Sequence, residues 1–559
     1  MHSLVIRGGE VFDGLGNPSQ RHDVAVSEGK IVAVGTNVGP AENTIDASGC
    51  IVSPGFIDVH THLDAQLFWD GHAAPSCFHG VTTVVLGNCG FGVAPYAMGT
   101  EDYLLQTLEV VEEIPFAATK SAVPFTWRTF GEYLDSLERL PLGVNVAAYV
   151  PHTPLRYAIM GDRSRFEIAD KGDLGKLVLA LEKAMEAGAV GLSTSRGTNH
   201  TDAFGGPVPS RLANDEELSS LVSATSGRAW QINLQAKLGD DADAMIEEIE
   251  RYVAFSEASN VHLSWDPLLS DRGSDTWRRL LDHNRRLVDK GIRLWPQVSA
   301  LPFTSAVSLA GPCATAATRE WSTVIGPDFW SLSINERCDR LMNNEIRLEL
   351  GKIALRTDVL VPPVFDWIVG YSPSHPGFGG KTIAELVGGE CGDSLRFLLD
   401  LVVNDNLQTL IQVPGANRDE DAVAALVADE YTMIGVGDAG AHVQSISNYT
   451  YPTYVLSHFV RDRGALSLAE AIRNLTAVPA EFLGLTERGV IAPGNAADLC
   501  VFDLESLALK SPEIRRDFPS EAARLYQGAN GYRAILVNGE ITITADEFAD
   551  TSPGRVLRS

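Results

Sequence analysis

The sequence predicts an α/β protein with a parallel sheet or barrel at its centre and a small β domain formed jointly by its two ends. Strand-sized apolar runs alternate with longer helical stretches through the middle of the chain. Short strands are expected from residue 1 to about 52, and the same pattern returns near the C-terminus. Residues from about 305 to 425 fit neither pattern and contain polar and Pro/Gly-rich pieces. We therefore expect an insertion or a lid there.

The two ends of the chain alternate apolar and polar residues around turn signals, which is typical of short strands. These strands are expected at 3–9, 23–26, 30–35, 497–503 and 532–540. We therefore expect residues 1–52 and 486–559 to build one β domain together, and residues 53–485 to form the α/β part between them.

The core strands are expected at the apolar runs of the central region, beginning with one that ends at Val59. The other runs are 80–87, 144–150, 189–193, 230–235, 261–265, 292–297 and 431–437. Between them, stretches such as 175–185 and 466–475 carry apolar residues at helical spacing. This order of elements favours parallel strands joined by helices.

Composition and charge argue against several classes of partner and of protein. The chain has 559 residues and a formal net charge of -28, so nucleic acid and anionic membrane surfaces are poor partners. No apolar run approaches the ~18 residues of a membrane span, and no signal-peptide pattern opens the chain. We therefore expect a cytoplasmic location. Seven scattered cysteines without a CxxC pair argue against a disulfide framework.

The most informative motif is a pair of histidines, His60 and His62, at the end of the first apolar run. On an extended strand, side chains two residues apart point the same way, so both imidazoles would face one spot. That arrangement grips a metal ion. Two solvated loop histidines are the alternative, and further ligands decide between the two interpretations.

Two other strand ends carry candidate ligands. Cys89 follows the run 80–87 among glycines that allow close approach, although a lone buried cysteine is usually inert. Asp438 ends the run 431–437 between glycines, where a turn aspartate is the ordinary interpretation. In a barrel the last strand lies next to the first, so Asp438 would lie beside the two histidines.

Together, the segments 54–62, 80–90 and 438–442 resemble the amidohydrolase superfamily, and within it the N-acyl-D-amino-acid deacylases (D-aminoacylases). The likeness covers nearly the whole chain. It implies an α/β fold with a distorted TIM (β/α)8 barrel, a composite β-sandwich formed by both termini, and zinc at the barrel mouth. It also implies that Cys89 replaces the bridging carboxylated lysine of other members.

The resemblance implies an enzyme that hydrolyses carbon–nitrogen bonds other than peptide bonds, with a small N-acyl amino acid as substrate. Metal-bound hydroxide would attack the amide, and Asp438 would ligate the metal and shuttle the proton. His442 is expected to support Asp438 or to meet the substrate, with packing around the ligands as the alternative.

Three further residues are candidates for binding a substrate, two of them arginines that could hold a carboxylate. The arginine that the family uses for this purpose is not evident at 447–452. Arg196 and Arg211 are substitutes by position, because a guanidinium can hold a carboxylate through two hydrogen bonds. His152 also follows a strand end and is expected to face the pocket. Ordinary ion pairing is the alternative interpretation for these residues.

The sequence departs from the family where two more zinc-binding histidines are expected. The first strand offers Gln231, Asn233 and Gln235 on the face that should line the barrel, and amides are poor zinc ligands. In the second, the family register places Trp265 at the ligand position and turns His262 outward, whereas a slip of one residue would reverse this.

We therefore expect one zinc ion held by His60, His62, Cys89 and Asp438, with a second site doubtful. Two alternatives stay open: a lyase, cyclase or decarboxylase that uses the single metal as a Lewis acid, and a metal-free binding protein on an inherited barrel. The expected partner is a small-molecule substrate, and the sequence leaves formation of a homo-oligomer open.

Overall fold

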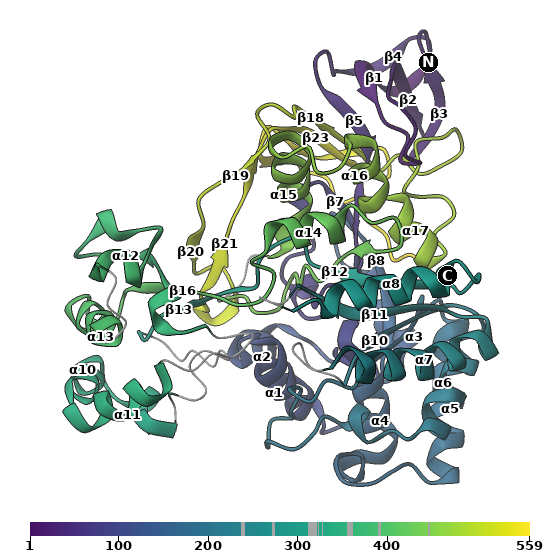
Figure 1. The fold of residues 1–559 in the computed structure, drawn as a ribbon. Coiled ribbons are helices and arrows are strands. Elements are labelled where there is room, and N and C mark those ends of the chain that lie inside the picture. The colour runs from purple at the N-terminus through teal and green to yellow at the C-terminus, as the bar shows by residue number, and fades with distance from the viewer. Residues whose placement is uncertain are drawn as a thin grey trace.

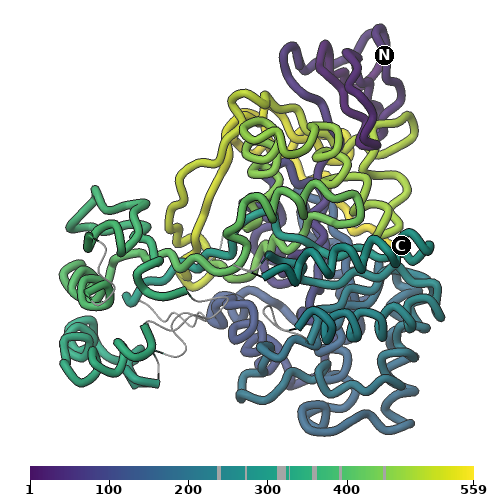
Figure 2. The backbone as a smooth tube through the Cα atoms, viewed as in Figure 1, coloured from purple at the N-terminus to yellow at the C-terminus, as the bar shows by residue number. Residues whose placement is uncertain are grey.

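The computed structural model describes residues 1–235, 241–270, 274–310, 321, 323–326, 328–354, 362–388, 393–444 and 448–559. Three parts are visible in Figure 1: a barrel surrounded by helices, a β-rich region that contains the N-terminus, and a lobe of short helices and strands at one side. The trace in Figure 2 shows C-terminal segments returning to the N-terminal strands.

Eight parallel strands form the barrel sheet, in the order β17-β12-β11-β10-β9-β8-β7-β6. Its outer strands meet beyond their ends, because Thr61 forms a parallel bridge with Ala439 and the backbone N–H of His62 donates to the carbonyl of Ala439 at 2.7 Å. The expected barrel is confirmed. Its strands are β6 (Phe56–Asp58), β7 (Val81–Leu86), β8 (Asn145–Pro151), β9 (Gly191–Ser195), β10 (Ala229–Asn233), β11 (His262–Leu268), β12 (Leu294–Val298) and β17 (Met433–Ile434).

Helices surround this sheet and bury one apolar face each. The helix α5 shows why: the carboxylate of Asp170 caps its first turn by accepting from the N–H groups of Gly172 and Asp173, both at 2.8 Å, and Leu177 and Leu181 lie on its buried side. The helices are α1 (Glu101–Glu112), α2 (Phe116–Ala122), α3 (Phe130–Glu138), α4 (His152–Met160), α5 (Lys171–Glu186), α6 (Asp215–Ala224), α7 (Ala242–Ser259), α8 (Thr276–Val288), α14 (Glu420–Val427), α15 (Tyr451–Tyr454), α16 (Leu468–Leu475) and α17 (Ala477–Leu483).

Both termini contribute to one nine-stranded sheet, which confirms the shared β domain. Strand β18 from the C-terminal part pairs antiparallel with β5, which runs directly into the first barrel strand. This sheet therefore anchors the segment that carries the two histidines. Its strands are β1 (His2–Val11), β2 (Gln20–Ser27), β3 (Lys30–Gly35), β4 (Ala41–Asp46), β5 (Ile51–Pro54), β18 (Leu499–Phe502), β23 (Tyr532–Val537), β24 (Glu540–Thr544) and β25 (Glu547–Phe548). Four further short strands pair outside it: β19 (Ala508–Leu509) with β22 (Ala529–Asn530), and β20 (Glu513–Arg515) with β21 (Arg524–Tyr526).

A lobe beside the barrel occupies the range in which an insertion was expected (Figure 1). Its described residues have a separate apolar core that includes Phe329, Trp367 and Leu399. The lobe contains β13 (Thr304–Val307), β14 (Ile368–Tyr371), β15 (Lys381–Thr382), β16 (Leu410–Pro414), α10 (Ile334–Met342), α11 (Asn344–Ala354), α12 (Ile383–Val387) and α13 (Ser394–Asn404).

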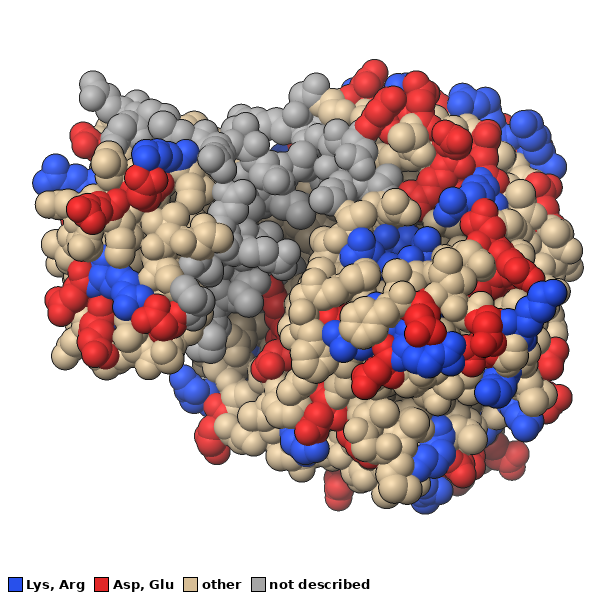
Figure 3. Space-filling model, turned by 90° about the horizontal axis from the view of Figure 1, so that it is seen from below, with Lys and Arg blue, Asp and Glu red and all other residues tan. Residues whose placement is uncertain are grey.

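Three further properties concern the helices, the surface charge and the cysteines of the described residues. None of their helices combines the length and the apolar character needed to cross a bilayer. Figure 3 shows acidic and basic side chains interspersed over the face in view. The cysteines with free thiols are Cys50, Cys77, Cys89, Cys338 and Cys500, while Cys313 and Cys391 lie outside the described residues.

Candidate metal centre

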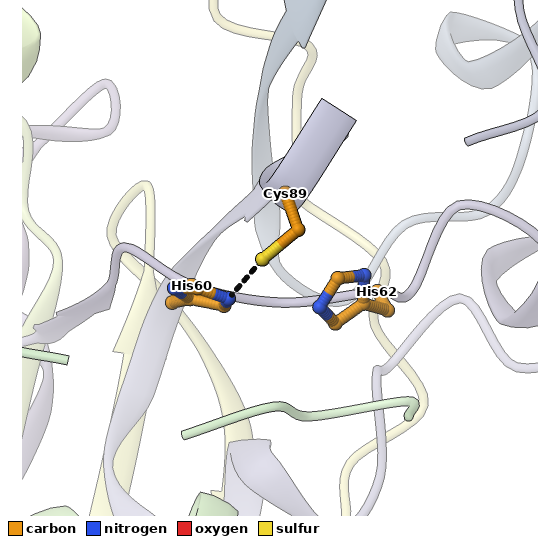
Figure 4. Close-up of side chains that lie close together, drawn as sticks. All are labelled: His60, His62 and Cys89. Atoms are coloured by element: carbon orange, nitrogen blue, oxygen red, sulfur yellow. Dashed lines mark hydrogen bonds between the residues drawn. The ribbon is translucent and has the colours of Figure 1, made fainter. Parts of the chain in front are cut away.

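Two histidines follow the first barrel strand at the point where the backbone leaves the sheet. His60 and His62 are both buried, and the backbone N–H of His60 donates to Asp58 Oδ1 at 3.2 Å. The centroids of the two rings lie 5.5 Å apart with an interplanar angle of 61°. The two imidazoles therefore border one small space, as Figure 4 shows.

Cys89 reaches this space from the end of the second barrel strand. After β7, Gly87 has a φ of 75° and Cys89 a φ of 52°, a left-handed turn that redirects the chain. The Cys89 sulfur lies 3.3 Å from His60 Nε2 (Figure 4). One ligand atom from each of His60, His62 and Cys89 lies within 4.8 Å of the others.

Asp438 completes the group from the end of the last barrel strand. Its Oδ1 atom lies 3.2 Å from His60 Nε2 and 3.8 Å from His62 Nε2. The residue has a φ of 47°, so the backbone turns sharply where the carboxylate is presented. Of the four side chains that the sequence nominated as metal ligands, the structure thus groups His60, His62 and Cys89, and it places Asp438 against the two histidines.

A glutamine fixes the orientation of His60. The Nδ1 atom of His60 lies 2.8 Å from Gln297 Oε1 on β12, and an amide oxygen only accepts, so Nδ1 carries the hydrogen. The other ring nitrogen, Nε2, is then free to ligate. Gln297 is itself held, because its Nε2 donates to Ser264 Oγ at 3.1 Å.

A buried glutamate, Glu112, faces the centre from the C-terminal end of α1. Its Oε2 atom lies 3.5 Å from His62 Nε2 and 3.9 Å from His442 Nε2. Burial raises the pKa of Glu112 to about 8. Glu112 was not among the residues nominated from the sequence, although it shares one helical face with the apolar residues Leu105 and Leu108.

His442 lies beside this glutamate. Its Nδ1 atom is 3.4 Å from Glu113 Oε2, and its backbone N–H donates to the carbonyl of Glu112 at 2.5 Å. Burial opposes the charged form of His442, but the carboxylates of Glu113, Glu112 and Asp438 outweigh it and raise its pKa to about 9. His442 therefore links the acidic end of α1 to the turn that carries Asp438.

The opposite wall carries a second unanticipated carboxylate, Asp266. Gln231 Nε2 donates to Asp266 Oδ2, and Asn233 Nδ2 donates to Oδ1 at 2.9 Å. Gln231 also accepts from the backbone N–H of Cys89 at 2.9 Å through its Oε1 atom. Burial raises the pKa of Asp266. This wall thus presents a carboxylate held by two amide side chains. The family resemblance had implied two histidines here.

The expected register of β11 was wrong by one residue. Trp265 pairs with Ile232, while Asp266 pairs with Asn233 on the face that lines the site. Since side chains alternate along a strand, placing Asp266 inward turns Trp265 to the outer face, where it joins the apolar core. Trp265 is therefore not at the ligand position.

His262 and Gln235 lie away from the centre. His262 Nδ1 is 2.9 Å from the carbonyl oxygen of Phe482, and its Nε2 is 2.7 Å from Arg293 Nη1, at the beginning of β11. Gln235 is exposed after the end of β10. Of the three amide side chains expected to line the barrel, only Gln231 and Asn233 contact the site.

Two arginines lie near one another beyond the end of β9. Arg196 Nη1 donates to the carbonyls of Ser210 and Ala213, both at 2.9 Å, and Arg211 Nη1 donates to the carbonyl of His200 at 2.9 Å. Neither guanidinium forms an ion pair within the part of the chain that the structure describes. Burial and the charge of Arg196 lower the pKa of Arg211.

His200 connects these arginines electrostatically to the metal centre. Its Nδ1 atom lies 2.7 Å from Ser195 Oγ. Burial, and then the positive charges of His442, Arg211 and His60, lower its pKa to about 3. His200 therefore lies within electrostatic reach of both Arg211 and His60.

His152 occupies a different position. It is fully buried, and its Nε2 atom lies 2.9 Å from Glu217 Oε1. The other carboxylate oxygen of Glu217 accepts from Arg156 Nη1. These three side chains form a buried charge cluster between α4 and α6.

A model of one known protein family matches most of the chain. The model of the amidohydrolase family matches residues 43–316 and 387–543. The chain belongs to the amidohydrolase family. It is accordingly a hydrolase that acts on carbon–nitrogen bonds other than peptide bonds.

Curated relatives from Alcaligenes xylosoxydans xylosoxydans align with nearly the full chain. An N-acyl-D-aspartate deacylase is 28% identical over 99% of this chain and 94% of its own length. A D-aminoacylase is 29% identical over 99% of this chain and 97% of its own length. These amidohydrolases are among the proteins that the chain resembles in sequence.

Solved structures confirm the fold. The N-acyl-D-glutamate deacylase of Bordetella bronchiseptica, complexed with zinc and a phosphonate inhibitor, superimposes with a TM-score of 0.67 at 24% identity and with complete coverage of both chains. A D-aminoacylase with a binuclear metal centre gives a TM-score of 0.66 at 23% identity, again over both complete chains. At these identities, the similarity shows that the fold is shared.

Proposed function

We propose that this amidohydrolase cleaves the amide bond of a small N-acyl amino acid, using one zinc ion held by His60, His62, Cys89 and Asp438. The observation that carries the proposal is the convergence of these four side chains from the first, second and last barrel strands. Full-length likeness to a D-aminoacylase and to an N-acyl-D-aspartate deacylase supports an N-acyl-D-amino acid as the substrate class.

The spacing of the donor atoms fits a zinc ion. Atoms that would each lie about 2.0–2.3 Å from one zinc ion lie about 3–4 Å from each other. The sulfur of Cys89 and Oδ1 of Asp438 lie 3.3 Å and 3.2 Å from His60 Nε2, and the same oxygen lies 3.8 Å from His62 Nε2. The donor set of imidazole, thiolate and carboxylate is one that zinc accepts.

The charges at the site also suit a cation. Burial raises the pKa of the Cys89 thiol well above its usual range, and the carboxylates of Asp266, Glu112 and Asp438 raise it further. A divalent ion favours the thiolate and offsets the repulsion among these acids. The bond from Nδ1 to Gln297 directs Nε2 of His60 toward the other donor atoms, and a bound cation would favour the neutral imidazole.

When bound, zinc lowers the pKa of water to near 7 and polarises the substrate carbonyl. The residues of the chain supply the rest. Asp438 accepts the proton of the attacking water and delivers it to the departing nitrogen as the amide bond breaks. Gln297 holds the ring of His60, and Gln231 and Asn233 hold the carboxylate of Asp266 on the opposite wall.

Arg211 and Arg196 are proposed to bind the substrate carboxylate. Both carry a positive charge that no described acid neutralises, and their bonds to backbone carbonyls hold the guanidinium groups in place. His442 is proposed to contact the substrate from the other side of Asp438. His152 is left out of this group because its imidazole is buried against Glu217.

The test is a panel of N-acetyl-D- and N-acetyl-L-amino acids with zinc-reconstituted protein. We expect release of the free D-amino acid, and loss of both activity and bound zinc in the His60→Ala plus His62→Ala variant. Zinc-loaded protein that hydrolyses no member of the panel would overturn the N-acyl amino acid assignment. Absence of bound zinc, iron or manganese in the native protein would overturn the metal site itself.

A further inference from the structure

A carboxylate outside the four nominated ligands faces the metal centre. Glu112 is the last residue of α1, and its side chain is 4% exposed. A buried carboxylate needs donors or a cation to balance its lost hydration. The ion-pair contacts of Glu112 among the described residues are with two imidazoles, His62 and His442, rather than with an arginine or lysine.

The geometry around His62 shows which groups face the carboxyl group of Glu112. His62 Nε2 faces Glu112 Oε2 at 3.5 Å and Asp438 Oδ1 at 3.8 Å, both longer than a normal N–H to oxygen hydrogen bond. These separations lie in the range of about 3–4 Å expected between two ligands of one zinc ion. The Nε2 atom of His62, one of the three grouped candidate ligands, thus contacts two carboxylate oxygens.

We propose that Glu112 is a further ligand of the metal centre, binding through Oε2 next to His62. This inference rests on the proposed metal site and adds a donor from a helix outside the barrel strands. The centre would then be built from imidazole, thiolate and two carboxylates. The short bond from the His442 backbone N–H to the carbonyl of Glu112 holds the end of α1 against the turn after β17.

A ligand differs from a supporting residue in what its removal does to the metal itself. Glu112→Gln keeps the size of the side chain and removes the charge. Glu113→Gln is a matched control, because Glu113 is the next residue and contacts His442 Nδ1 rather than His62. Cobalt(II) is the probe, since its visible absorption bands report the number and type of ligands and its sulfur charge-transfer band reports Cys89.

We expect Glu112→Gln to shift the visible cobalt bands, to keep the sulfur band, and to weaken zinc binding by at least about 100-fold in a competition titration. Glu113→Gln should keep the native cobalt spectrum. Cys89→Ser should lose the sulfur band, which verifies that the ion sits in this site.

Two results would overturn the assignment in distinguishable ways. If the native protein binds cobalt and Glu112→Gln gives the same spectrum and affinity, Glu112 is not a ligand and the four-residue site stands. If the native protein binds no divalent metal, the proposed function fails together with this inference. A circular dichroism spectrum of Glu112→Gln that matches the native one shows that any change in metal binding is not caused by unfolding.

Discussion

His60 Nδ1 lies 2.8 Å from the amide oxygen of Gln297, which directs the other ring nitrogen, Nε2, toward Cys89 and Asp438. This relationship couples β12, which supplies no proposed ligand, to the first ligand of the centre. The tautomer of His60 therefore depends on a neutral side chain on a different strand.

Gln297→Leu tests that dependence. Loss of the acceptor frees the ring to adopt the other tautomer, and we expect zinc affinity to fall by about 10- to 100-fold. Ser264→Ala is the control, because it removes only the hydroxyl that holds the amide nitrogen of Gln297. Affinities from competition with a chelator separate the two variants. Equal affinity in Gln297→Leu and the native protein would reject the orienting role.

Asp438→Asn tests the proton shuttle. The φ of 47° at this position is tolerated by asparagine, so the turn should be kept while the basic oxygen is lost. We expect kcat to fall by about 10²- to 10⁴-fold, with an unchanged circular dichroism spectrum and melting temperature of the fold. Activity within threefold of native at saturating zinc would show that another group moves the proton.

Arg211→Gln tests recognition of the substrate carboxylate. A hydrogen bond to a charged group contributes about 1.5–3 kcal/mol, so KM for an N-acyl amino acid should rise about 10- to 100-fold with little change in kcat. The same substrate with its carboxylate converted to an amide is the control, because it offers no charge to the guanidinium. Steady-state kinetics on both compounds gives the answer: an equal loss on both would place Arg211 in a structural role.

Protonation of His79 is expected to make the free energy of unfolding depend on pH. It is fully buried, with Nε2 at 2.9 Å from the carbonyl of Gln527 and Nδ1 at 2.8 Å from Thr453 Oγ1. Burial lowers its pKa from 6.5 to about 4. The unfolded chain therefore binds a proton that the folded chain excludes. The contribution of His79 to stability is complete above pH 6.5 and falls as the pH drops towards 4, by up to about 3 kcal/mol.

The measurement is urea unfolding of the native protein and of His79→Gln between pH 4 and pH 8. The variant should lose some stability at every pH because its hydrogen bonds change. The difference between the two proteins should shrink below pH 6.5, because the variant has no imidazole to protonate. A difference that stays constant from pH 8 to pH 4 would contradict the assignment.

The sequence predicted the barrel well because periodicity and turn signals mark its strands. The run 144–150 became β8, and the run 80–87 became β7. The four nominated metal-facing residues could be found because each ends an apolar run, and the carboxyl ends of barrel strands meet at one face.

The carboxylates of the site were harder to predict for two separate reasons. Asp266 was missed because a shift of one residue exchanges the two faces of a strand. The register taken from the family resemblance placed Trp265, rather than Asp266, on the face that lines the barrel. Glu112 was missed because it stands in an acidic stretch at a helix end, which resembles a solvated surface. The packing of α1 against the turn at His442 accounts for the burial of its side chain.

The bridge between Thr61 and Ala439 closes the sheet and joins the earliest and latest barrel strands. In folding, contacts between such distant parts of the chain form at a high entropic cost and slow the search for the native state. The candidate ligands lie on both sides of this closure, so a partly folded chain presents at most a fragment of the site. An ion that prefers the closed barrel would stabilise it by mass action, and the cellular supply of that ion would then influence how much of the protein persists.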